Sequence, residues 1–451
     1  MATTTSTSST APTLSSLGVG SGLDAESIVT KLVALERQPI TALQEKASTM
    51  QTKISAYGQI KSLVSTIQDA NAKFLDPSFW TSTKATPSDT SVLTVTTTAG
   101  VNIPAGNYNM TVSQLAQAQS VVANTGVSSS SDALGGTGKL TIQLGTWSND
   151  GTSDSFAAGS SAAVSIDVSA TDSLEAIRDK INGASAGVTA TIIKDSSGSR
   201  LVMSSSTTGA SNGFRIQAEA AADGTPASAS IAALAYDPQN GTSGTTRTQA
   251  GQGAMATLNG IAISSETNTF KDVLAGMSLT VNKVSSSPVT LAVTQDTDAI
   301  TKAFTDFATA YSNLANYLKT NTAYDENSKS GGPLQGDSLA TGLLQQFRSR
   351  LGQAKTSSSV FGNLSAIGLQ MSATGGMTVN TTTLTSAINN NLGELKKFFT
   401  NAGTSSGAAD DGMANIVRTL TGSLTDTEGA ISTRTTGLQT SIKDNQKQQD
   451  A

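Results

Sequence analysis

The chain has 451 residues, of which 37% are hydrophobic and 14% charged, and its formal net charge is −5. It contains neither cysteine nor histidine, which excludes disulfides, thiolate nucleophiles, Cys- or His-ligated metal sites, and catalytic triads or bases that use His. The acidic balance argues against nucleic-acid binding, which needs clustered Lys and Arg, and no apolar run reaches the ~18 residues of a membrane span. We therefore expect no membrane insertion and no cofactor.

The N-terminal part of the chain predicts two long helices after a polar tail rich in Ser and Thr. The first helix begins near Asp24, a good N-cap, and its apolar residues recur at the spacing of one helix face. Pro39 is expected to end or kink this helix, because proline lacks the N–H and clashes with the preceding turn. A second apolar series, from residue 43 to 74, predicts another helix. The apolar face of the first helix consists of Ile28, Leu32 and Leu35.

The middle of the chain, from about residue 85, changes from helical spacing to alternation with many β-branched residues, which predicts strands. One amphipathic helix over 174–181 interrupts them. Residues 205–250 are rich in Ala, Gly, Ser and Thr and predict a loosely structured segment. The predicted strands are 91–98, 108–113, 139–144, 164–168, 188–193, 200–204, 256–263, 278–284 and 289–293.

Helical spacing returns near residue 299 and predicts helices over 300–318, 339–351 and 384–399. The aromatic stripe of the first of these is interpreted as core, because aromatic side chains bury large areas; it consists of Phe304, Phe307 and Tyr311. In the tail, apolar residues seven positions apart indicate a coiled-coil seam, which nearby glycines weaken. The seam consists of Val417, Leu424, Ile431 and Leu438, with Asn445 next in register.

The order of helices, then strands, then helices predicts a multidomain α+β protein. In this arrangement the terminal helices form a coiled coil and a helical domain, and β-rich domains are inserted one inside another. The predicted domains are a disordered start and coiled coil (1–46 with 432–451), a helical domain (47–84 with 300–431), an inner β domain (85–121 with 251–299) and an outer β-rich domain with one short helix (122–250).

The glycines Gly18, Gly20 and Gly22 invite comparison with a phosphate-binding loop. No strand precedes them, and residue 23, where a dinucleotide fingerprint has its third glycine, is Leu. A flexible hinge before a helix is therefore the favoured interpretation.

Paired carboxylates are the remaining candidates for chemistry, since glycoside hydrolysis needs two of them about 5–9.5 Å apart. The pairs here lie in polar, turn-like stretches and are interpreted as solvated surface charges. They are Asp325 with Glu326, Asp410 with Asp411, and Asp167 with Asp172. We predict no catalytic, cofactor or metal site and no enzymatic activity. The two apolar seams, at residues 28–35 and 417–438, instead predict self-association through helix packing.

Several motifs resemble the flagellar hook-associated protein 2 family, the caps of flagellar filaments. The N-terminal motif is Leu17-Gly-Val-Gly-Ser-Gly-Leu-Asp24, followed by Ile28–Glu36. The segment Leu174–Asn182 is similar to the hook IN motif that flagellins and caps share. Gly332-Pro-Leu-x-Gly-Asp-Ser338 and Ile367-Gly-Leu369 resemble the C-terminal region of the cap family.

The resemblance implies a flagellar filament cap that is exported by the flagellar type III route and located outside the cell at the distal tip of the flagellum. It implies a homo-oligomeric ring that promotes folding and insertion of flagellin. The implied partners are a second copy, flagellin, hook-associated junction proteins and a flagellar export chaperone. The alternatives are a hook–filament junction or flagellin-like structural subunit, a surface adhesin, and a secreted hydrolase.

Overall fold

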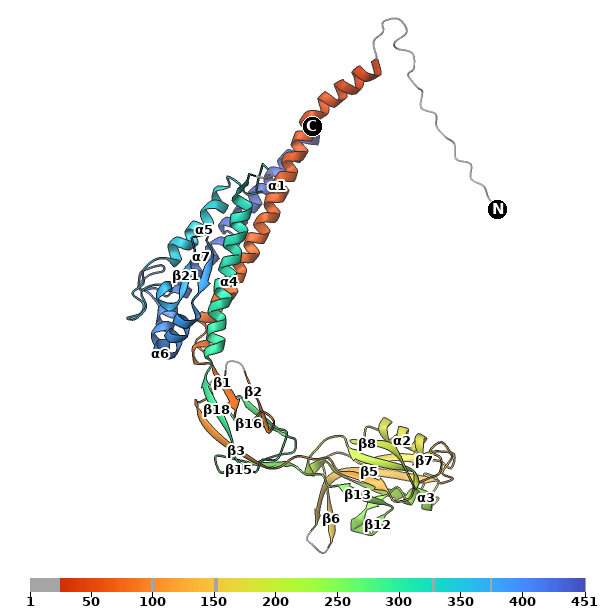
Figure 1. Cartoon of the computed structure of the whole chain (residues 1–451). Helices are drawn as coiled ribbons and strands as arrows, with labels where there is room; N and C mark the ends of the chain where they lie inside the picture. The colour runs from red at the N-terminus through yellow and green to blue at the C-terminus, as the bar shows by residue number, and fades with distance from the viewer. Residues whose placement is uncertain are drawn as a thin grey trace, which may run out of the picture. The chain divides into compact units, whose positions relative to one another are not determined.

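The computed structural model describes residues 25–98, 101, 103–149, 153–326, 329–373 and 375–450 (Figure 1). They divide into two compact units. The helical unit contains the described residues up to Trp80 together with those from Thr297 onward, and the β unit runs from Thr81 to Asp296. The expected α+β multidomain class is confirmed, because long helices and several separate sheets occupy different parts of the chain.

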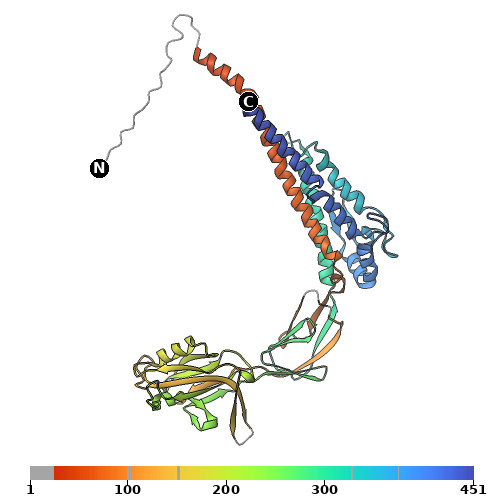
Figure 2. The same ribbon diagram turned by 180° about the vertical axis from the view of Figure 1, so that it is seen from behind.

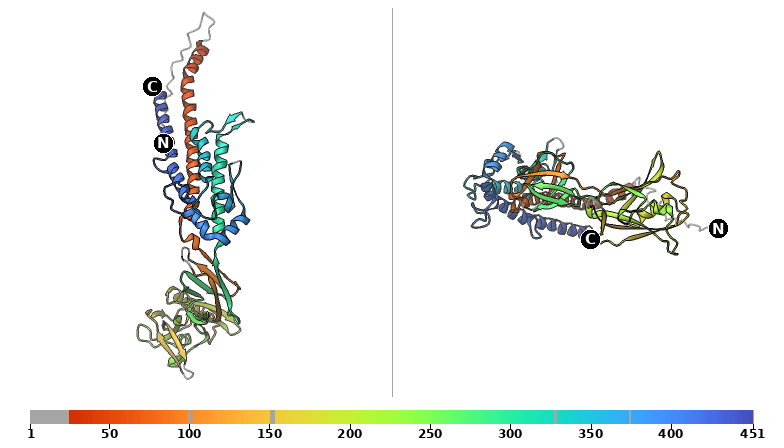
Figure 3. Two further views of the ribbon diagram at one scale, coloured as in Figure 1. Left: turned by 90° about the vertical axis from the view of Figure 1, so that its left-hand side faces the viewer. Right: turned by 90° about the horizontal axis from the view of Figure 1, so that it is seen from below.

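The helical unit is built around one apolar core to which both ends of the chain contribute. Figures 2 and 3 show the last helix running alongside the first. A short β-hairpin, β21 (Leu369–Met371) with β22 (Met377–Val379), packs beside α4. The helices are α1 (Ala25–Leu75), α4 (Thr297–Thr322), α5 (Ser338–Leu351), α6 (Thr381–Thr400), α7 (Met413–Thr425) and α8 (Ala430–Asp450).

Aromatic rings fill the centre of this core. The ring centroid of Phe74 lies 4.7 Å from that of Phe304 and 4.9 Å from that of Phe399. The indole N–H of Trp80 donates to the backbone carbonyl of Phe74 at 2.9 Å, so its polar atom is paired inside the core. The expected core role of the α4 stripe is confirmed, because its three aromatic side chains, Phe304, Phe307 and Tyr311, are at most 1% exposed.

Of the two outcomes expected at Pro39, an end of the helix is wrong, since α1 continues through this residue as one helix. Proline removes one hydrogen bond, the one to the carbonyl of Leu35. Leu35 is 61% exposed, so water reaches this part of the helix and solvates the freed carbonyl. Beyond the proline, the hydroxyl of Thr41 donates to the carbonyl of Arg37 at 3.1 Å.

The β unit contains two separate apolar cores. One lies between a five-stranded sheet of order β1-β18-β3-β14-β15 and a three-stranded sheet of order β16-β17-β2, and every pairing is antiparallel. These strands are β1 (Thr83–Pro87), β2 (Leu93–Thr97), β3 (Gly106–Gln114), β14 (Ala254–Leu258), β15 (Ile261–Ser265), β16 (Thr269–Leu274), β17 (Met277–Val281) and β18 (Val289–Gln295).

The second core comes from residues between β3 and β14 in the sequence. One sheet has the order β12-β11-β10-β5-β6, with β7 also paired to β5, and the other has the order β13-β4-β9-β8. The helix α2 (Leu174–Gly183) buries Leu174, Ile177 and Ile181 in this core, as its spacing predicts. The other elements are β4 (Ser120–Ala123), β5 (Gly138–Asn149), β6 (Asp154–Ala158), β7 (Val164–Val168), β8 (Val188–Asp195), β9 (Gly198–Ser205), β10 (Gly213–Glu219), α3 (Ala229–Ala232), β11 (Tyr236–Asp237), β12 (Thr242–Ser243) and β13 (Thr245–Gln249). The four-domain division expected from the sequence stays a prediction.

Two expectations for the β segments are wrong. The single strand expected over 256–263 is the hairpin of β14 and β15, because Asn259 and Gly260 have positive φ values of 49° and 83° and form a tight turn. The segment expected to be loose, 205–250, contains β10 to β13. In its strand β10, Phe214 and Ile216 are completely buried. The alternation of apolar and polar residues in β10 is short, and the neighbouring segments rich in Ala and Ser do not continue it.

A buried ion pair joins three helices of the helical unit. The carboxylate of Asp337, whose side chain is completely buried, accepts from the hydroxyl of Tyr57 on α1 at 2.5 Å and from the guanidinium of Arg434 on α8 at 2.7 Å. Asp337 is also the N-cap of α5 and accepts from the backbone N–H groups of Leu339 and Ala340. One carboxylate therefore fixes α1, α5 and α8 against each other.

The pKa values of these groups follow from the same contacts. Burial by itself raises the pKa of Asp337, but the hydrogen bonds from Tyr57, Arg434 and the N–H of Ala340, together with the charge of Arg434, outweigh it and lower this pKa. Burial and the neighbouring carboxylate raise the pKa of Tyr57, so its hydroxyl remains a donor. Asp337 thus remains ionised at neutral pH in spite of its burial.

Replacing Asp337 by Asn should lower the free energy of unfolding at pH 7. Breaking a fully buried pair costs about 3–5 kcal/mol, and we expect about 3 kcal/mol because the side chain of Arg434 is 47% exposed. Urea unfolding followed by circular dichroism measures the loss. The control Asp444→Asn breaks an exposed pair with Lys447 and should cost less than about 0.5 kcal/mol. Equal, small effects would contradict this role of Asp337.

The difference in stability between the wild-type protein and Asp337→Asn should depend on pH. Because the pKa of Asp337 is lower in the folded than in the unfolded chain, its carboxylate stabilises the fold fully above the ordinary value of 3.8, and this contribution is lost as the pH falls below it. Urea unfolding at a series of pH values should therefore show the two curves converging at low pH. A constant difference down to pH ~2 would rule out the ionised carboxylate as its source.

Candidate assembly interface

The N-terminal part of α1 extends beyond the core of the helical unit. No residue between Ile28 and Thr49 is buried. This segment nevertheless has large apolar side chains on about half of its circumference, and each is between 40% and 61% exposed. They are Ile28, Val29, Leu32, Val33, Leu35 and Ile40. An apolar stripe this wide on a helix is typical of a surface that packs against another element.

Nearer the core, α8 covers the continuation of this stripe. The main element against which α8 packs is α1. From Thr433 onward, the residues of α8 that are not exposed recur at alternating spacings of three and four residues, and all the others are exposed. This is the heptad spacing of a helix-packing seam. The seam residues are Ile431, Thr435, Leu438, Ile442, Asn445 and Gln449 on α8, and Leu43, Ala47, Met50, Ile54 and Tyr57 on α1.

The same spacing continues on α1 toward its N-terminus, through Ile40, Glu36, Val33 and Val29. The amine of Lys61 donates to the hydroxyl of Ser432 at 3.3 Å, which places these residues at the same level of the antiparallel pair. Since both helices rise about 1.5 Å per residue, Asp450, 18 residues after Ser432, lies level with about residue 43 of α1. Residues 28–40 therefore lie beyond the described end of α8.

The structure separates the predicted seam residues into two groups. Ile28, Leu32 and Leu35 are exposed together on α1. Val417, Leu424 and Ile431 are at most 2% exposed inside the core of the same chain, and Leu438 is partly buried against it. The tail is also not one continuous helix, because α7 ends at Thr425 and α8 begins at Ala430.

The predicted hinge residues Gly18, Gly20 and Gly22 lie outside the described residues. The predicted apolar face of the first helix does not include Val29, Val33 and Ile40, although they are in register with the series from Leu43 to Tyr57. The heptad spacing is visible in the sequence, but the end or kink expected at Pro39 divides it into one apolar series before the proline and one after it.

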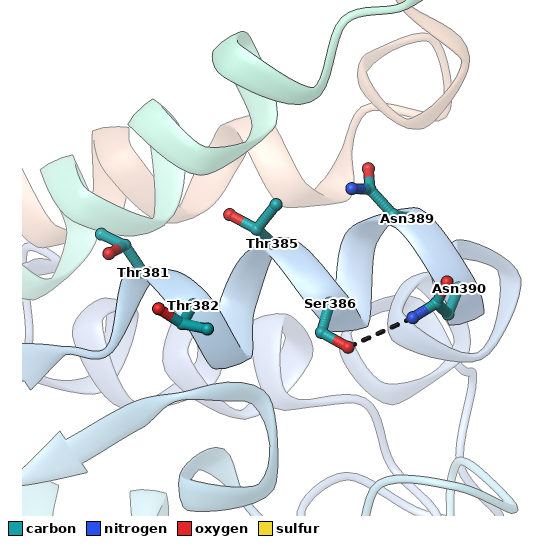
Figure 4. Close-up of a pocket in the computed structure, with 6 residues that line it drawn as sticks. All are labelled: Thr381, Thr382, Thr385, Ser386, Asn389 and Asn390. Atoms are coloured by element: carbon teal, nitrogen blue, oxygen red, sulfur yellow. Dashed lines mark hydrogen bonds between the residues drawn. The ribbon is translucent and has the colours of Figure 1, made fainter.

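A second surface on the helical unit is a shallow hollow of about 490 Å³ along α6 (Figure 4). Its side chains are hydroxyls and amides only, and the amide of Asn390 donates to the hydroxyl of Ser386 at 3.2 Å. The helix backbone leaves helical geometry directly afterwards, at Asn391. The lining residues are Thr381, Thr382, Thr385, Ser386, Asn389 and Asn390.

Three of the six carboxylates considered from the sequence have partners that define their role. Asp172 accepts from the amine of Lys180 at 2.5 Å, and Asp410 accepts from the backbone N–H of Thr404 at 2.9 Å. Asp411 accepts from the backbone N–H of Gly407 at 2.8 Å and is only 4% exposed, so its interpretation as a solvated surface charge is wrong. Among the described residues, no cluster of three or more acidic side chains is placed to hold a metal ion, and no helix has the length and apolarity to cross a membrane.

Comparison with known proteins matches most of the chain to one family. The family models for the N-terminus and the C-terminus of flagellar hook-associated protein 2 match residues 21–119 and 251–451, and the flagellin hook IN motif matches residues 139–207. Flagellar hook-associated protein 2 of Escherichia coli K12 is 34% identical over 366 residues, which cover 79% of this chain and 73% of that protein. The B-type protein of Pseudomonas aeruginosa is 30% identical, with 95% and 87% covered.

A solved structure extends this similarity to three dimensions. The crystal structure of the D1-D2-D3 domains of the flagellar cap protein FliD from Escherichia coli aligns with a TM-score of 0.61 at 30% identity. The alignment covers 85% of this chain and 99% of the solved chain. With identity, order of motifs and fold in agreement, the chain belongs to the flagellar hook-associated protein 2 family.

Proposed function

We propose that this protein caps the distal tip of the flagellar filament, outside the cell. There, copies of the chain assemble into a ring that promotes the folding and insertion of flagellin. The observation that carries the proposal is the exposed apolar stripe of α1, which continues the α1–α8 seam beyond the described end of α8. Membership of a family that includes flagellar cap proteins supports it.

The energetics of the stripe favour weak and reversible contacts between copies. Full burial of a Val, Leu or Ile side chain contributes about 1.5–3 kcal/mol, and the six side chains of the stripe are already about half covered. Covering the rest therefore contributes roughly 1 kcal/mol each, or about 6 kcal/mol in total. Association itself costs about 4–15 kcal/mol. One stripe alone gives a marginal contact, so a stable ring needs several weak contacts, each of which can break and form again.

Such contacts suit a cap that must move as the filament grows. A cap whose symmetry differs from that of the filament cannot satisfy all its contacts at once, so one site stays open for the next flagellin. We infer that the chain is exported unfolded by the flagellar type III route, which the absence of cysteine suits. The proposed further partners are hook-associated junction proteins and a flagellar export chaperone. The hinge at Gly18, Gly20 and Gly22 belongs to this proposal.

Charges placed in the stripe should weaken self-association. We expect Ile28→Glu with Leu32→Glu, and separately Val29→Glu with Val33→Glu, to raise the concentration needed for oligomers at least tenfold, because each pair removes apolar contacts and buries charge. Light scattering at several concentrations measures the change, and circular dichroism checks the fold.

The matched control is Ala34→Glu with Gln38→Glu. These residues have the same four-residue spacing on the same exposed segment, but they lie on the opposite face of α1. The control should leave the oligomer size unchanged. If both stripe variants associate like the wild-type protein, copies do not meet through this stripe.

The cap function is tested in cells that lack their own copy of this protein. We expect wild-type protein to restore long filaments with the protein detected by immunogold labelling at the tip, and the stripe variants to leave flagellin in the medium. Labelling at the base of the filament would favour the alternative of a junction subunit. Labelling along its whole length would favour a flagellin-like subunit.

The hinge proposal predicts slow filament growth when Gly18, Gly20 and Gly22 are all replaced by Ala, because alanine restricts the backbone. Filament length measured at fixed times after induction tests this. Growth at the wild-type rate would show that flexibility at these positions is not required.

A further inference from the structure

A small hollow of about 250 Å³ lies between the C-terminal end of α5, the loop before α7, and α7 itself. Its floor is apolar: Ile416 is 3% exposed, and Leu420 is partly buried against the core of the helical unit. Its rim has the hydroxyls of Ser406, Thr419 and Ser423. At ~30 Å³ per water molecule, the hollow has the volume of about eight waters, which accommodates one large apolar side chain.

A cation without a partner lies at the edge of this hollow. Arg350, in the last turn of α5, lines the hollow and is exposed, and its guanidinium forms no hydrogen bond or ion pair within the described part of the chain. Two neighbouring carboxylates already have partners in the loop. Asp410 accepts from the backbone N–H and the hydroxyl of Thr404, and Asp411 accepts from Gly407 and from the amide of Asn415.

A buried lysine lies near Arg350 and the two carboxylates. Lys355 is 4% exposed, and its amine donates to the backbone carbonyl of Ala408 at 3.2 Å. Burial lowers the pKa of Lys355, the charge of Asp411 raises it, the charge of Arg350 lowers it, and the charge of Asp410 raises it. Because Asp410 and Asp411 already have partners in the loop, the guanidinium of Arg350 is the charge that remains available at the edge of the hollow. A ligand with a negative charge would therefore be attracted to the edge of the hollow, and an apolar group would be attracted to its floor.

We propose that this hollow binds the C-terminal end of a partner polypeptide whose last residue is apolar. Arg350 would pair with the α-carboxylate through two parallel N–H donors, and the last side chain would cover Ile416 and Leu420. A C-terminal residue has its carboxylate and its apolar side chain on the same carbon atom. This suits a hollow that Arg350 lines together with Ile416 and Leu420. An internal Asp or Glu needs its apolar group from a neighbouring residue, whose side chain points elsewhere in an extended peptide.

The inference does not rest on the cap proposal, because its test uses the isolated full chain and a short peptide. The probe is fluorescein-Gly-Ser-Gly-Ser-Leu with a free carboxylate, and binding is followed by fluorescence anisotropy. We expect it to bind at least tenfold more tightly than the same peptide with an amidated C-terminus, and at least tenfold more tightly than a peptide that ends in Ser. Equal binding of the free and amidated peptides would overturn the proposal.

Variants locate the binding to this hollow. Arg350→Gln should weaken binding of the free-acid peptide at least tenfold, and Thr419→Glu, which places a negative charge on the rim, should do the same. The matched control Arg418→Gln removes an exposed cation from α7 outside the hollow and should leave binding within twofold. Loss of binding in the control but not in Arg350→Gln would contradict the assignment. Competition by octanoate at the same concentration as unlabelled peptide would also contradict it, because the hollow would then recognise acyl carboxylates rather than a polypeptide end.

Discussion

The buried carboxylate of Asp337 determines where the two ends of this chain meet. Tyr57 precedes it by 280 residues and Arg434 follows it by 97. Tyr57 nevertheless donates to one carboxylate oxygen of Asp337 and Arg434 to the other. A carboxylate buried without these donors would be strongly unfavourable, so α8 is held on α1 in one register. That register determines which residues of α1 are covered by α8. The exposed stripe that we propose as the assembly surface therefore depends on an ion pair lying well outside it.

The helices were predicted well where apolar spacing alone decides them. The stripe of Phe304, Phe307 and Tyr311 has helical spacing and no competing signal, and these residues form core as expected. Errors arose where a local rule met a particular environment. Pro39 is a helix breaker in general, but in a solvated segment the loss of one hydrogen bond does not end the helix. Asn259 and Gly260 form a typical hairpin turn, but the apolar residues on both sides concealed it.

The candidate sites were predicted less completely than the fold. Periodicity identified Ile28, Leu32 and Leu35 as apolar on one face, and they are exposed together. The same periodicity could not tell that Val417 and Leu424 face the interior of their own chain, because heptad spacing is identical for packing within a chain and between chains. The role of Asp337 was invisible for another reason. Its partners come from distant parts of the sequence, and only the tertiary structure brings them together.

The β unit is inserted in the sequence between the two segments of the helical unit, and this insertion has a consequence for loop entropy. In an unstructured chain, contact between Tyr57 and Asp337 closes a loop of 280 residues. In the folded β unit, Thr83 is paired opposite Gln295, so the residues between them no longer belong to the flexible loop. The loop then consists of the 26 residues from Tyr57 to Thr83 and the 42 residues from Gln295 to Asp337. This is about a quarter of the original length and lowers the closure cost by about 1.2 kcal/mol. The helical unit thus closes more readily once the β unit has folded, which gives the chain an order of folding from the inside outward.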